Sequence, residues 1–301
     1  MTLNTEVRAT PPAGRTRPSP QDEPSSYRRH HLVIYLALGT IAFSAASAFA
    51  WVLNVSLKTN QEFLGTRPWS IADEFHLENY ANAWTNADVG AYFGNSVVVS
   101  ITSTVLGVVV SAFAAYPIAR IPFRLNGAVL AVFLMGLMVP WMVTFIPLYL
   151  TLQDLGLLDT RIGLILVYAT YNLPFNIFVL VGFLRTLPRE LEEAAAVDGA
   201  GPTTTFVRVI LPLLGPGLAS VTIISFLNNW NEFFYALVLI HSPSKMTLPL
   251  GLFQLGQAAD YGTNWVTLFA GMIITALPVL ILFALLQKQV TKGLTAGALK
   301  G

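Results

Sequence analysis

Two groups of polar residues interrupt a strongly apolar sequence, and their residue types suit binding rather than catalysis. The first group lies within residues 185–212, where three glutamates precede a run of alanines and a glycine. The glutamates favour the positive N-terminal end of a helix dipole, and Gly199 would end that helix. A short helix that is acidic on one side and small and apolar on the other can dock in a groove of another protein. The residues expected to serve this docking are Glu190, Glu193, Ala194, Ala195, Asp198, Gly199 and Pro212.

The second group gathers amides, a carboxylate and aromatic rings within residues 228–235. Polar side chains are costly at membrane depth and normally face the interior of a helix bundle or a wet cavity. Amide and carboxylate groups can hydrogen-bond to sugar hydroxyls, while the apolar faces of a sugar can stack on aromatic rings. The residues expected to line a substrate pathway are Asn172, Asn176, Asn228, Asn229, Trp230, Asn231, Glu232 and Tyr235.

Alternatives to a pathway stay open for both parts of this second group. Trp, Tyr and Asn are also common where a helix leaves the membrane, so residues 228–235 could mark the outer membrane interface. Asn172 and Asn176 lie in a separate apolar segment, and their amides could instead bridge packed helices. For the first group, a helix lying on the bilayer is disfavoured, because such helices carry Lys and Arg on their polar face.

The residue inventory gives no support for catalysis or for a metal site. The chain contains no cysteine, which excludes disulfides and thiolate metal ligands. Its histidines lack metal-ligand spacing, and no serine, histidine and aspartate form a recognisable catalytic set. The phosphate loop Gly-x-x-x-x-Gly-Lys-Ser/Thr does not occur. We therefore expect a protein that is not an enzyme, binds no metal or cofactor and does not itself hydrolyse ATP.

The composition indicates that both groups belong to a membrane protein. Of 301 residues, 54% are hydrophobic and 11% are charged, whereas soluble domains carry about 25% charged residues. Gaps between the charge clusters are long enough for a membrane helix, which needs roughly 20 apolar residues. The fifth apolar segment exceeds one crossing and must tilt, break or leave the bilayer. The sequence predicts an all-α membrane protein with six transmembrane helices, in segments 32–55, 92–118, 126–150, 162–184, 209–240 and 266–286.

Basic residues set the expected orientation. Most of them fall in the N-terminal tail, after the second and fourth segments, and at the C-terminus, which the positive-inside rule assigns to the cytoplasm. The 241–265 loop would then be external, and Gly251, Gly256 and Gly262 would make it flexible. The expected divisions are a disordered cytoplasmic tail at 1–30, a first transmembrane helix at 31–58, an external loop at 59–90, a core at 91–287 and a cytoplasmic tail at 288–301.

The spacing of the first group resembles a known signature. Three residues separate Glu193-Ala194-Ala195 from Gly199, and nine more precede an aliphatic residue, one variable residue and Leu211-Pro212. With Trp230-Asn231-Glu232-Phe233 and the Gly-Leu-Thr-Ala-Gly stretch at 293–297, this pattern resembles the carbohydrate-uptake branch of ABC importer permeases, the maltose-permease-like type I subunits. The resemblance runs from about residue 32 to residue 301.

The resemblance implies that the helix starting near Glu190 is a coupling helix seated in a cleft of an ATP-binding subunit. Glu193 would pair there with a basic group, and Asp198 with Gly199 would shape the turn. The C-terminal stretch would reach the ATPase dimer. The implied partners are a second homologous permease subunit, two copies of an ATP-binding subunit that use ATP and magnesium, and an extracellular solute-binding protein contacted by the 241–265 loop. The implied cargo is an oligosaccharide or disaccharide carried across the cytoplasmic membrane, and no nucleic-acid partner is expected.

Two other transport functions remain as alternatives. One is an ABC permease for a different polar solute, such as a glycerol-phosphate ester. The other is a secondary transporter driven by an ion gradient, a class that usually shows internal repeats and membrane-buried acidic pairs. The sequence has no convincing repeat, and Glu232 is the only acid near a predicted span.

Overall fold

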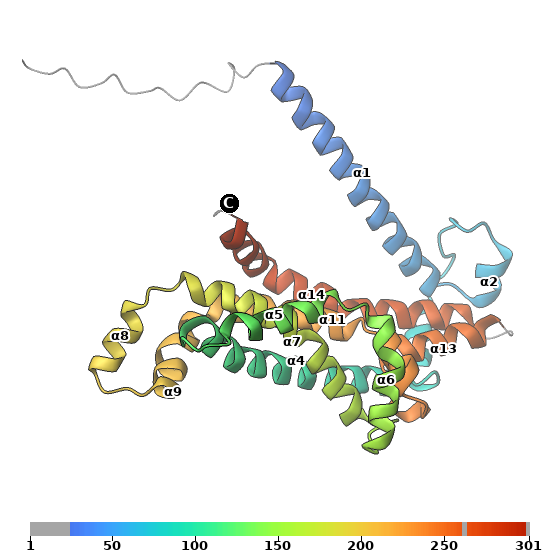
Figure 1. The fold of residues 1–301 in the computed structure, drawn as a ribbon. Coiled ribbons are helices and arrows are strands. Elements are labelled where there is room, and N and C mark those ends of the chain that lie inside the picture. The colour runs from blue at the N-terminus through green and yellow to red at the C-terminus, as the bar shows by residue number, and fades with distance from the viewer. Residues whose placement is uncertain (1–24, 261–263, 299–301) are drawn as a thin grey trace, which may run out of the picture. The chain divides into compact units, whose positions relative to one another are not determined.

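The computed structural model describes residues 25–260 and 264–298, and every regular element within these ranges is helical (Figure 1). The all-α prediction is therefore confirmed for the described chain. A π-helix at Phe206–Ile210 and a 3₁₀ turn at Pro243–Lys245 join the α-helices. The α-helices are α1 (Ser25–Ser56), α2 (Asn60–Gly65), α3 (Glu78–Thr85), α4 (Val89–Arg120), α5 (Asn126–Met138), α6 (Trp141–Asp154), α7 (Arg161–Thr186), α8 (Glu190–Val197), α9 (Pro202–Thr205), α10 (Leu211–Leu213), α11 (Gly215–Trp230), α12 (Phe234–Leu239), α13 (Leu248–Asp260) and α14 (Trp265–Ala298).

The chain divides into two compact units, Met1–Trp51 and Val52–Gly301. The described part of the first unit is residues 25–51, which form most of α1. Because α1 begins at Ser25, the last six residues of the expected disordered tail, 25–30, are helical. Residues 1–24 lie outside the described ranges.

Within the described residues, four helices are long and apolar enough to cross a membrane: Leu32–Ser56, Val89–Arg120, Arg161–Thr186 and Trp265–Leu285. Two bent pairs add further candidate spans. The first joins Asn126–Met138 to Met142–Asp154 at 106°, and the second joins Pro202–Leu213 to Gly215–Trp230 at 76°. Counting each pair as one span gives six, which matches the number predicted from the apolar segments.

Prolines account for the two breaks. Val139 is extended, with a ψ of 119°, because the ring of Pro140 excludes the helical conformation of the residue before it. The predicted single segment 126–150 therefore consists of two helices. In the second pair the bend lies at Leu214, between Pro212 and Pro216, so the overlong segment 209–240 breaks rather than tilts.

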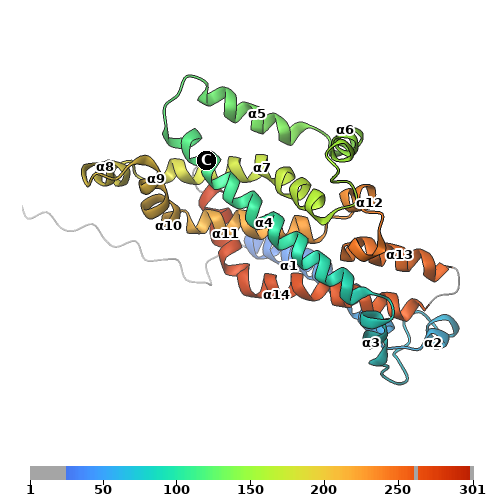
Figure 2. The same ribbon diagram turned by 90° about the horizontal axis from the view of Figure 1, so that it is seen from below.

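The second unit is built on α4, α7 and α11, which pack against one another side by side, with α14 against α11 (Figures 1 and 2). One apolar cluster surrounds Tyr168 and Trp230, and another surrounds Leu184 and Phe206 toward the opposite ends of α4 and α7. Helices α4 and α7 approach closely at Gly107, where an added Cβ would lie 3.0 Å from the carbonyl oxygen of Ala169. This close packing gives the candidate site a fixed frame.

The expected flexible loop 241–265 is largely ordered into a helix, because residues 248–260 form α13. Gly251 lies within α13, and an added Cβ would stand 2.1 Å from Cδ2 of Tyr92. This glycine therefore permits close packing of α13 on α4 and does not provide a hinge. Gly262 lies outside the described ranges.

The remaining boundaries also differ in detail from the predicted ones. The expected external loop 59–90 contains the short helices α2 and α3, and α4 already begins at Val89. The expected C-terminal tail is helical through Ala298, as the end of α14.

Candidate functional site

Helix α8 carries the first group of predicted residues. Its first turn contains Glu190 and Glu193, which complement the positive end of the helix dipole. It ends at Val197, and Gly199 follows its C-cap with a φ of +80°, which is unfavourable for residues with a side chain. The N–H of Ala200 then donates to the carbonyl oxygen of Ala195 at 2.9 Å, which closes the last turn. Local sequence alone accounts for both ends of this helix.

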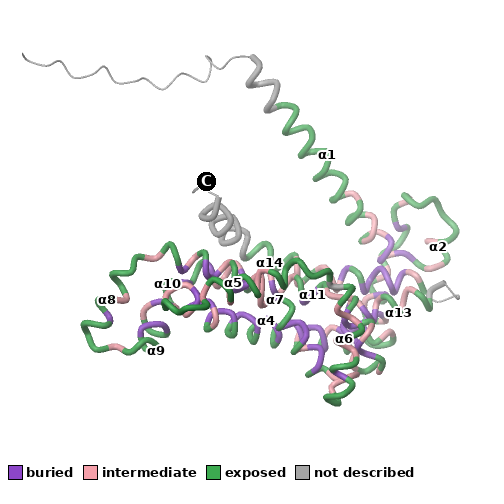
Figure 3. Tube along the Cα trace, viewed as in Figure 1, coloured by how far each residue is buried: buried purple, intermediate pink, exposed green. Residues whose placement is uncertain are grey.

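One face of α8 is open to the surroundings (Figure 3). Glu190, Glu193, Ala194 and Val197 follow the helical spacing of three and four residues, and all are exposed. The side chain of Val197 is 88% exposed, although it is apolar. Ala195 is buried on the inner face. The exposed face therefore combines two carboxylates with a small apolar surface, whereas the sequence analysis expected these on opposite sides of the helix.

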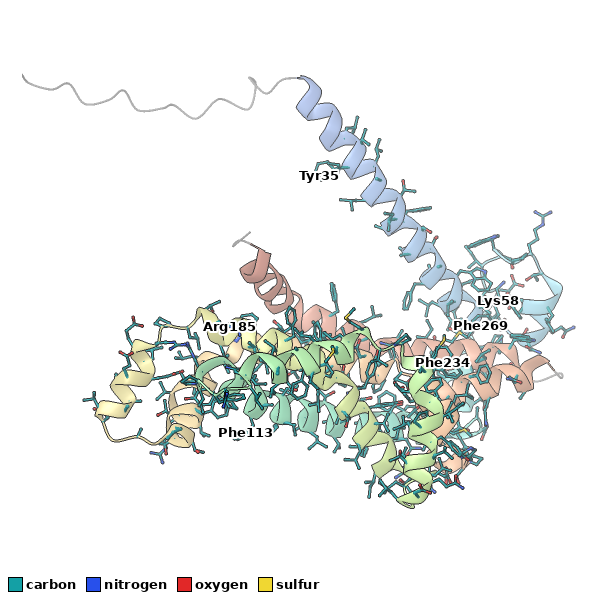
Figure 4. The ribbon with its side chains drawn as sticks, in the orientation of Figure 1. Tyr35, Lys58, Phe113, Arg185, Phe234 and Phe269 are labelled. Atoms are coloured by element: carbon teal, nitrogen blue, oxygen red, sulfur yellow. The ribbon has the colours of Figure 1, made fainter. Side chains whose placement is uncertain are left out.

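The inner face of α8 is held by a residue that the sequence analysis missed. Nε of Arg120, the last residue of α4, lies 2.9 Å from Oε1 of Glu192. The two residues are far apart in the sequence, and no local pattern marks Arg120 as a partner. Phe113, labelled in Figure 4, and Tyr116 also belong to this end of α4, and both rings pack against Phe206.

The connection from α8 to the membrane passes through α9, the π-helix and α10. The N–H of Leu211 donates to the carbonyl oxygen of Phe206, five residues earlier, as a π-helix requires. π-Helical turns are rare and are often found at functional sites. Pro212 follows at once and precedes the 76° bend into α11. Helix α8 is thus connected along the chain to α11, which contains Asn228 and Asn229.

Amides of the second group form a buried hydrogen-bond cluster between three helices. Asn172 on α7 donates from Nδ2 to Oδ1 of Asn229 on α11 at 2.9 Å. Nδ2 of Asn229 donates to the hydroxyls of Ser103 and Thr104 on α4, each at 3.0 Å. Asn228 donates to Oδ1 of Asn172 at 3.2 Å. Bridging of packed helices, one of the two interpretations left open for Asn172, is therefore part of its role.

The other members of the second group point in different directions. Asn176 is fully buried and accepts a hydrogen bond from the Ser225 hydroxyl at 3.1 Å. Trp230 is buried and donates from Nε1 to the Thr275 carbonyl oxygen of α14 at 3.2 Å. Asn231 is exposed, and its amide donates to the Leu227 carbonyl oxygen one helical turn earlier. The sequence cluster is therefore not a single cluster in space.

A cavity of about 760 Å³ lies between the α5–α6 pair and α7, with α11 and α12 contributing to its wall. Three of the predicted pathway residues, Asn172, Asn228 and Tyr235, line it. Tyr171 adds a half-exposed ring that meets the ring of Tyr235 edge-on, with 5.7 Å between their centres. Most of the remaining lining is aliphatic. Aromatic rings beside amides and an apolar wall match the chemistry of a sugar, and the volume lies in the range of ligand pockets.

At the other end of α7, a carboxylate fastens the segment that follows α12. Asp159 accepts hydrogen bonds from the backbone N–H groups of His241 and Ser242, both at 3.0 Å, and from the Ser242 hydroxyl. Its Oδ2 also lies 3.1 Å from Nζ of Lys245. Burial raises the pKa of Asp159, but the hydrogen bonds from Ser242, His241 and Lys245 outweigh burial and hold that pKa well below the usual aspartate range.

Within the described residues, no group of three His, Asp or Glu side chains is placed to hold a metal ion.

Residues 107–295 match the family described as binding-protein-dependent transport system inner membrane components. The chain belongs to this family. It is thus a membrane permease, and the matched range includes α8, the three asparagines of the hydrogen-bond cluster and the residues that line the cavity.

Individual relatives resemble this permease over most of their length. The diacetylchitobiose uptake system permease protein NgcG of Streptomyces coelicolor is 37% identical, covering 92% of this chain and 91% of its own. The melibiose/raffinose/stachyose import permease protein MelC of Bacillus subtilis is 31% identical, covering 89% and 96%. A solved chain of a bacterial ABC transporter involved in import of the acidic polysaccharide alginate has the same fold, with a TM-score of 0.78 at 22% identity over 88% of this chain and 98% of that chain.

Proposed function

We propose that this permease translocates a disaccharide or oligosaccharide as one subunit of an ABC importer, and that α8 is its coupling helix. The observation that carries the proposal is the exposed face of α8. The chain leads from α8 through Pro212 into α11, which contributes to the wall of the cavity. Glu193 on this face would meet a basic group of an ATP-binding subunit. That partner would bind ATP and magnesium, and this chain would bind neither.

The sugar assignment rests on two observations. Relatives that match over most of their length are described as permeases for diacetylchitobiose and for melibiose, raffinose and stachyose. In this chain, Tyr171 and Tyr235 offer rings for stacking, and the exposed Asn228 offers an amide for sugar hydroxyls. The amide of Asn172 is already hydrogen-bonded within the protein. One permease would contribute half of the pathway, so the importer would pair it with a second homologous permease, two ATP-binding subunits and an external solute-binding protein.

The proposed orientation puts α8 and both termini in the cytoplasm. Basic residues gather near α8, as the positive-inside rule requires of the cytoplasmic side, and a group of acidic residues lies at the opposite ends of the helices. The former are Arg120, Arg124, Arg185, Arg189 and Arg208, and the latter are Asp73, Glu74, Glu78 and Asp88.

The test uses the assembled importer in proteoliposomes, with uptake of labelled diacetylchitobiose, raffinose and a glycerol-phosphate ester measured beside ATP hydrolysis. Glu193→Arg should lower uptake and substrate-stimulated hydrolysis at least about tenfold, because breaking an interface charge pair costs roughly 2 kcal/mol or more. Glu74→Arg is the matched control, since it reverses an exposed acid at the far end of the molecule. Equal uptake by both variants would refute the assignment of α8. Uptake of the glycerol-phosphate ester without uptake of either sugar would refute the assignment of a sugar as the substrate.

A further inference from the structure

Arg120 makes contacts in two directions at the end of α4. Its side chain is 4% exposed, with Nε 2.9 Å from Oε1 of Glu192 on α8. Its Nη2 donates to the Leu187 carbonyl oxygen at 2.7 Å, in the turn between α7 and α8. The contact with Glu192 is an ion pair without the alignment of a hydrogen bond. One guanidinium therefore contacts both the helix that is proposed to dock and the turn that leads into it.

The chemistry of arginine suits this position. A buried charge is costly unless it is paired, so the pair stays formed while α8 lies against α4. The planar guanidinium presents several N–H groups in fixed directions and can hold two acceptors at once, which a lysine does less well. Glu192 lies on the inner face of α8, whereas Glu190 and Glu193 are exposed. The three glutamates therefore divide into one that holds α8 in place and two that are free to meet a partner.

We propose that Arg120 is a positioning residue that fixes α8 to α4 and so carries movement of the docked helix directly into the bundle. This proposal rests on the proposed function, in which α8 docks on an ATP-binding subunit. The covalent route from α8 runs through a π-helix and turns by 76° before it reaches α11. The route through Arg120 ends on α4, a single helix of 32 residues.

The route through Arg120 and α4 also reaches the residues of the candidate substrate pathway inside the bundle. Asn229 of α11 donates to both Ser103 and Thr104 of α4, so a shift of α4 moves the helix that carries Asn228. Near α8, Phe206, the first residue of the π-helix, packs against α4 at the start of this route, with its ring centre 4.7 Å from that of Tyr116. Helices α4, α8 and α11 are thereby linked by side-chain contacts as well as along the chain. Without the Arg120–Glu192 pair, α8 could follow its partner without carrying α4 along.

The test compares Arg120→Gln and Glu192→Gln in the assembled importer, with sugar imported per ATP hydrolysed as the readout. Each variant should consume roughly threefold to tenfold more ATP per sugar, which lies within the roughly two- to thirtyfold changes in coupling that mutations along such networks produce. The double variant should be no worse than either single one, because both remove the same contact. Arg124→Gln is the matched control, since Arg124 is an exposed arginine in the connection just after α4.

A second measurement separates docking from transmission. The chain has no native cysteine, so Val197→Cys, at an 88% exposed position, can carry a photo-cross-linker to the ATP-binding subunit. The Val197→Cys importer is the reference for every variant built on it. Cross-linking that persists in Arg120→Gln while the ratio of sugar to ATP falls supports the proposal. Persisting cross-links with an unchanged ratio overturn it.

The remaining outcomes are also decisive. Absence of cross-links in the Val197→Cys reference itself would refute the proposed docking of α8 and leave the Arg120–Glu192 contact untouched. If the importer with Arg120→Gln fails to assemble, the ratio of sugar imported to ATP hydrolysed is measured with Arg120→Lys and Glu192→Gln instead. Arg120→Lys keeps the charge and should recover part of the ratio, and full assembly with wild-type ratios in both variants would overturn the proposal.

Discussion

Tyr168 on α7 donates its hydroxyl hydrogen to a carboxylate oxygen of Glu232 at 2.6 Å. The same carboxylate accepts from the backbone N–H groups of Tyr235 at 2.8 Å and Ala236 at 3.2 Å. The first N–H groups of a helix have no partner within the helix, so Glu232 supplies partners for the first turn of α12. It thereby holds α12, and with it Tyr235, at the wall of the cavity. In this conformation the carboxylate oxygens of Glu232 accept hydrogen bonds from the protein itself, whereas the sequence predicted that they would bind sugar hydroxyls.

Replacing this carboxylate should destabilise the fold rather than only weaken sugar binding. Glu232→Ala removes the partner of the α12 N–H groups and leaves the Tyr168 hydroxyl unpaired, a loss of about 2 kcal/mol. The midpoint of thermal unfolding of the purified importer should fall accordingly. Asn231→Ala is the control, because its exposed amide bonds only to its own helix and should change stability by less than about 0.5 kcal/mol. Equal midpoints for the two variants would contradict the capping role.

Two glycines of α13 should respond in opposite ways to substitution by alanine. At Gly251 an added Cβ would stand 2.1 Å from the Tyr92 ring, so Gly251→Ala should cost about 1 to 3 kcal/mol through overpacking. At Gly256 the nearest atom would be Cδ2 of Leu268 at 3.6 Å, an ordinary contact. Gly256→Ala should therefore stabilise α13 by up to about 1 kcal/mol. Thermal unfolding of the two variants measures both effects, and unchanged stability in both would favour the flexible loop expected from the sequence.

The contacts of Asp159 predict a pH-dependent contribution to stability. Its pKa is lower in the folded protein than the usual value of about 3.9 in an unfolded chain. The ionised carboxylate therefore stabilises the fold above about pH 4, and this contribution declines as the pH falls toward the folded pKa. Asp159→Asn, which tolerates the φ of +53° at this position, should lower the unfolding temperature at neutral pH.

The difference in unfolding temperature between Asp159→Asn and the unmodified chain should become smaller as the pH drops below about 4. Unfolding temperatures recorded across a pH series measure this narrowing. Asp154→Asn removes an exposed carboxylate at the end of α6 and should have no such effect at any pH. If the difference in unfolding temperature stays constant down to pH 3, the charge of the Asp159 carboxylate is not the source of the stabilisation.

The α8 region was predictable because its signals are local. Glutamates in a first turn, a glycine in the left-handed region and proline past the end determine where a short helix begins and stops. The sequence places the glutamates on one side of the helix and Ala194 with Ala195 on the other. In the structure Ala194 is exposed beside Glu190 and Glu193, and only Ala195 is buried. The motif thus contributes residues to an exposed face and to a buried face, and their spacing in the sequence does not separate the two.

The polar group near residue 230 was predictable in kind but not in arrangement. Consecutive residues of a helix point about 100° apart, so neighbours in sequence diverge in space. Asn228 reaches the cavity, Asn229 lies inside the bundle, and Asn231 is exposed. Which of them faces the cavity depends on the rotation of α11 about its axis. That rotation is set by packing against α4, α7 and α14.

The sequence by itself determined the all-α membrane class, the apolar segments, the family signature and the position of α8. The signature is recognised by its resemblance to a known family, and the other three depend on composition, periodicity or capping, which act over a few residues or a few turns. Only the tertiary structure decided that Arg120 meets Glu192, that Tyr168 meets Glu232 and that Gly251 faces Tyr92. Such pairs join helices distant in sequence, and their geometry depends on how each helix is rotated, bent and shifted when the whole bundle packs.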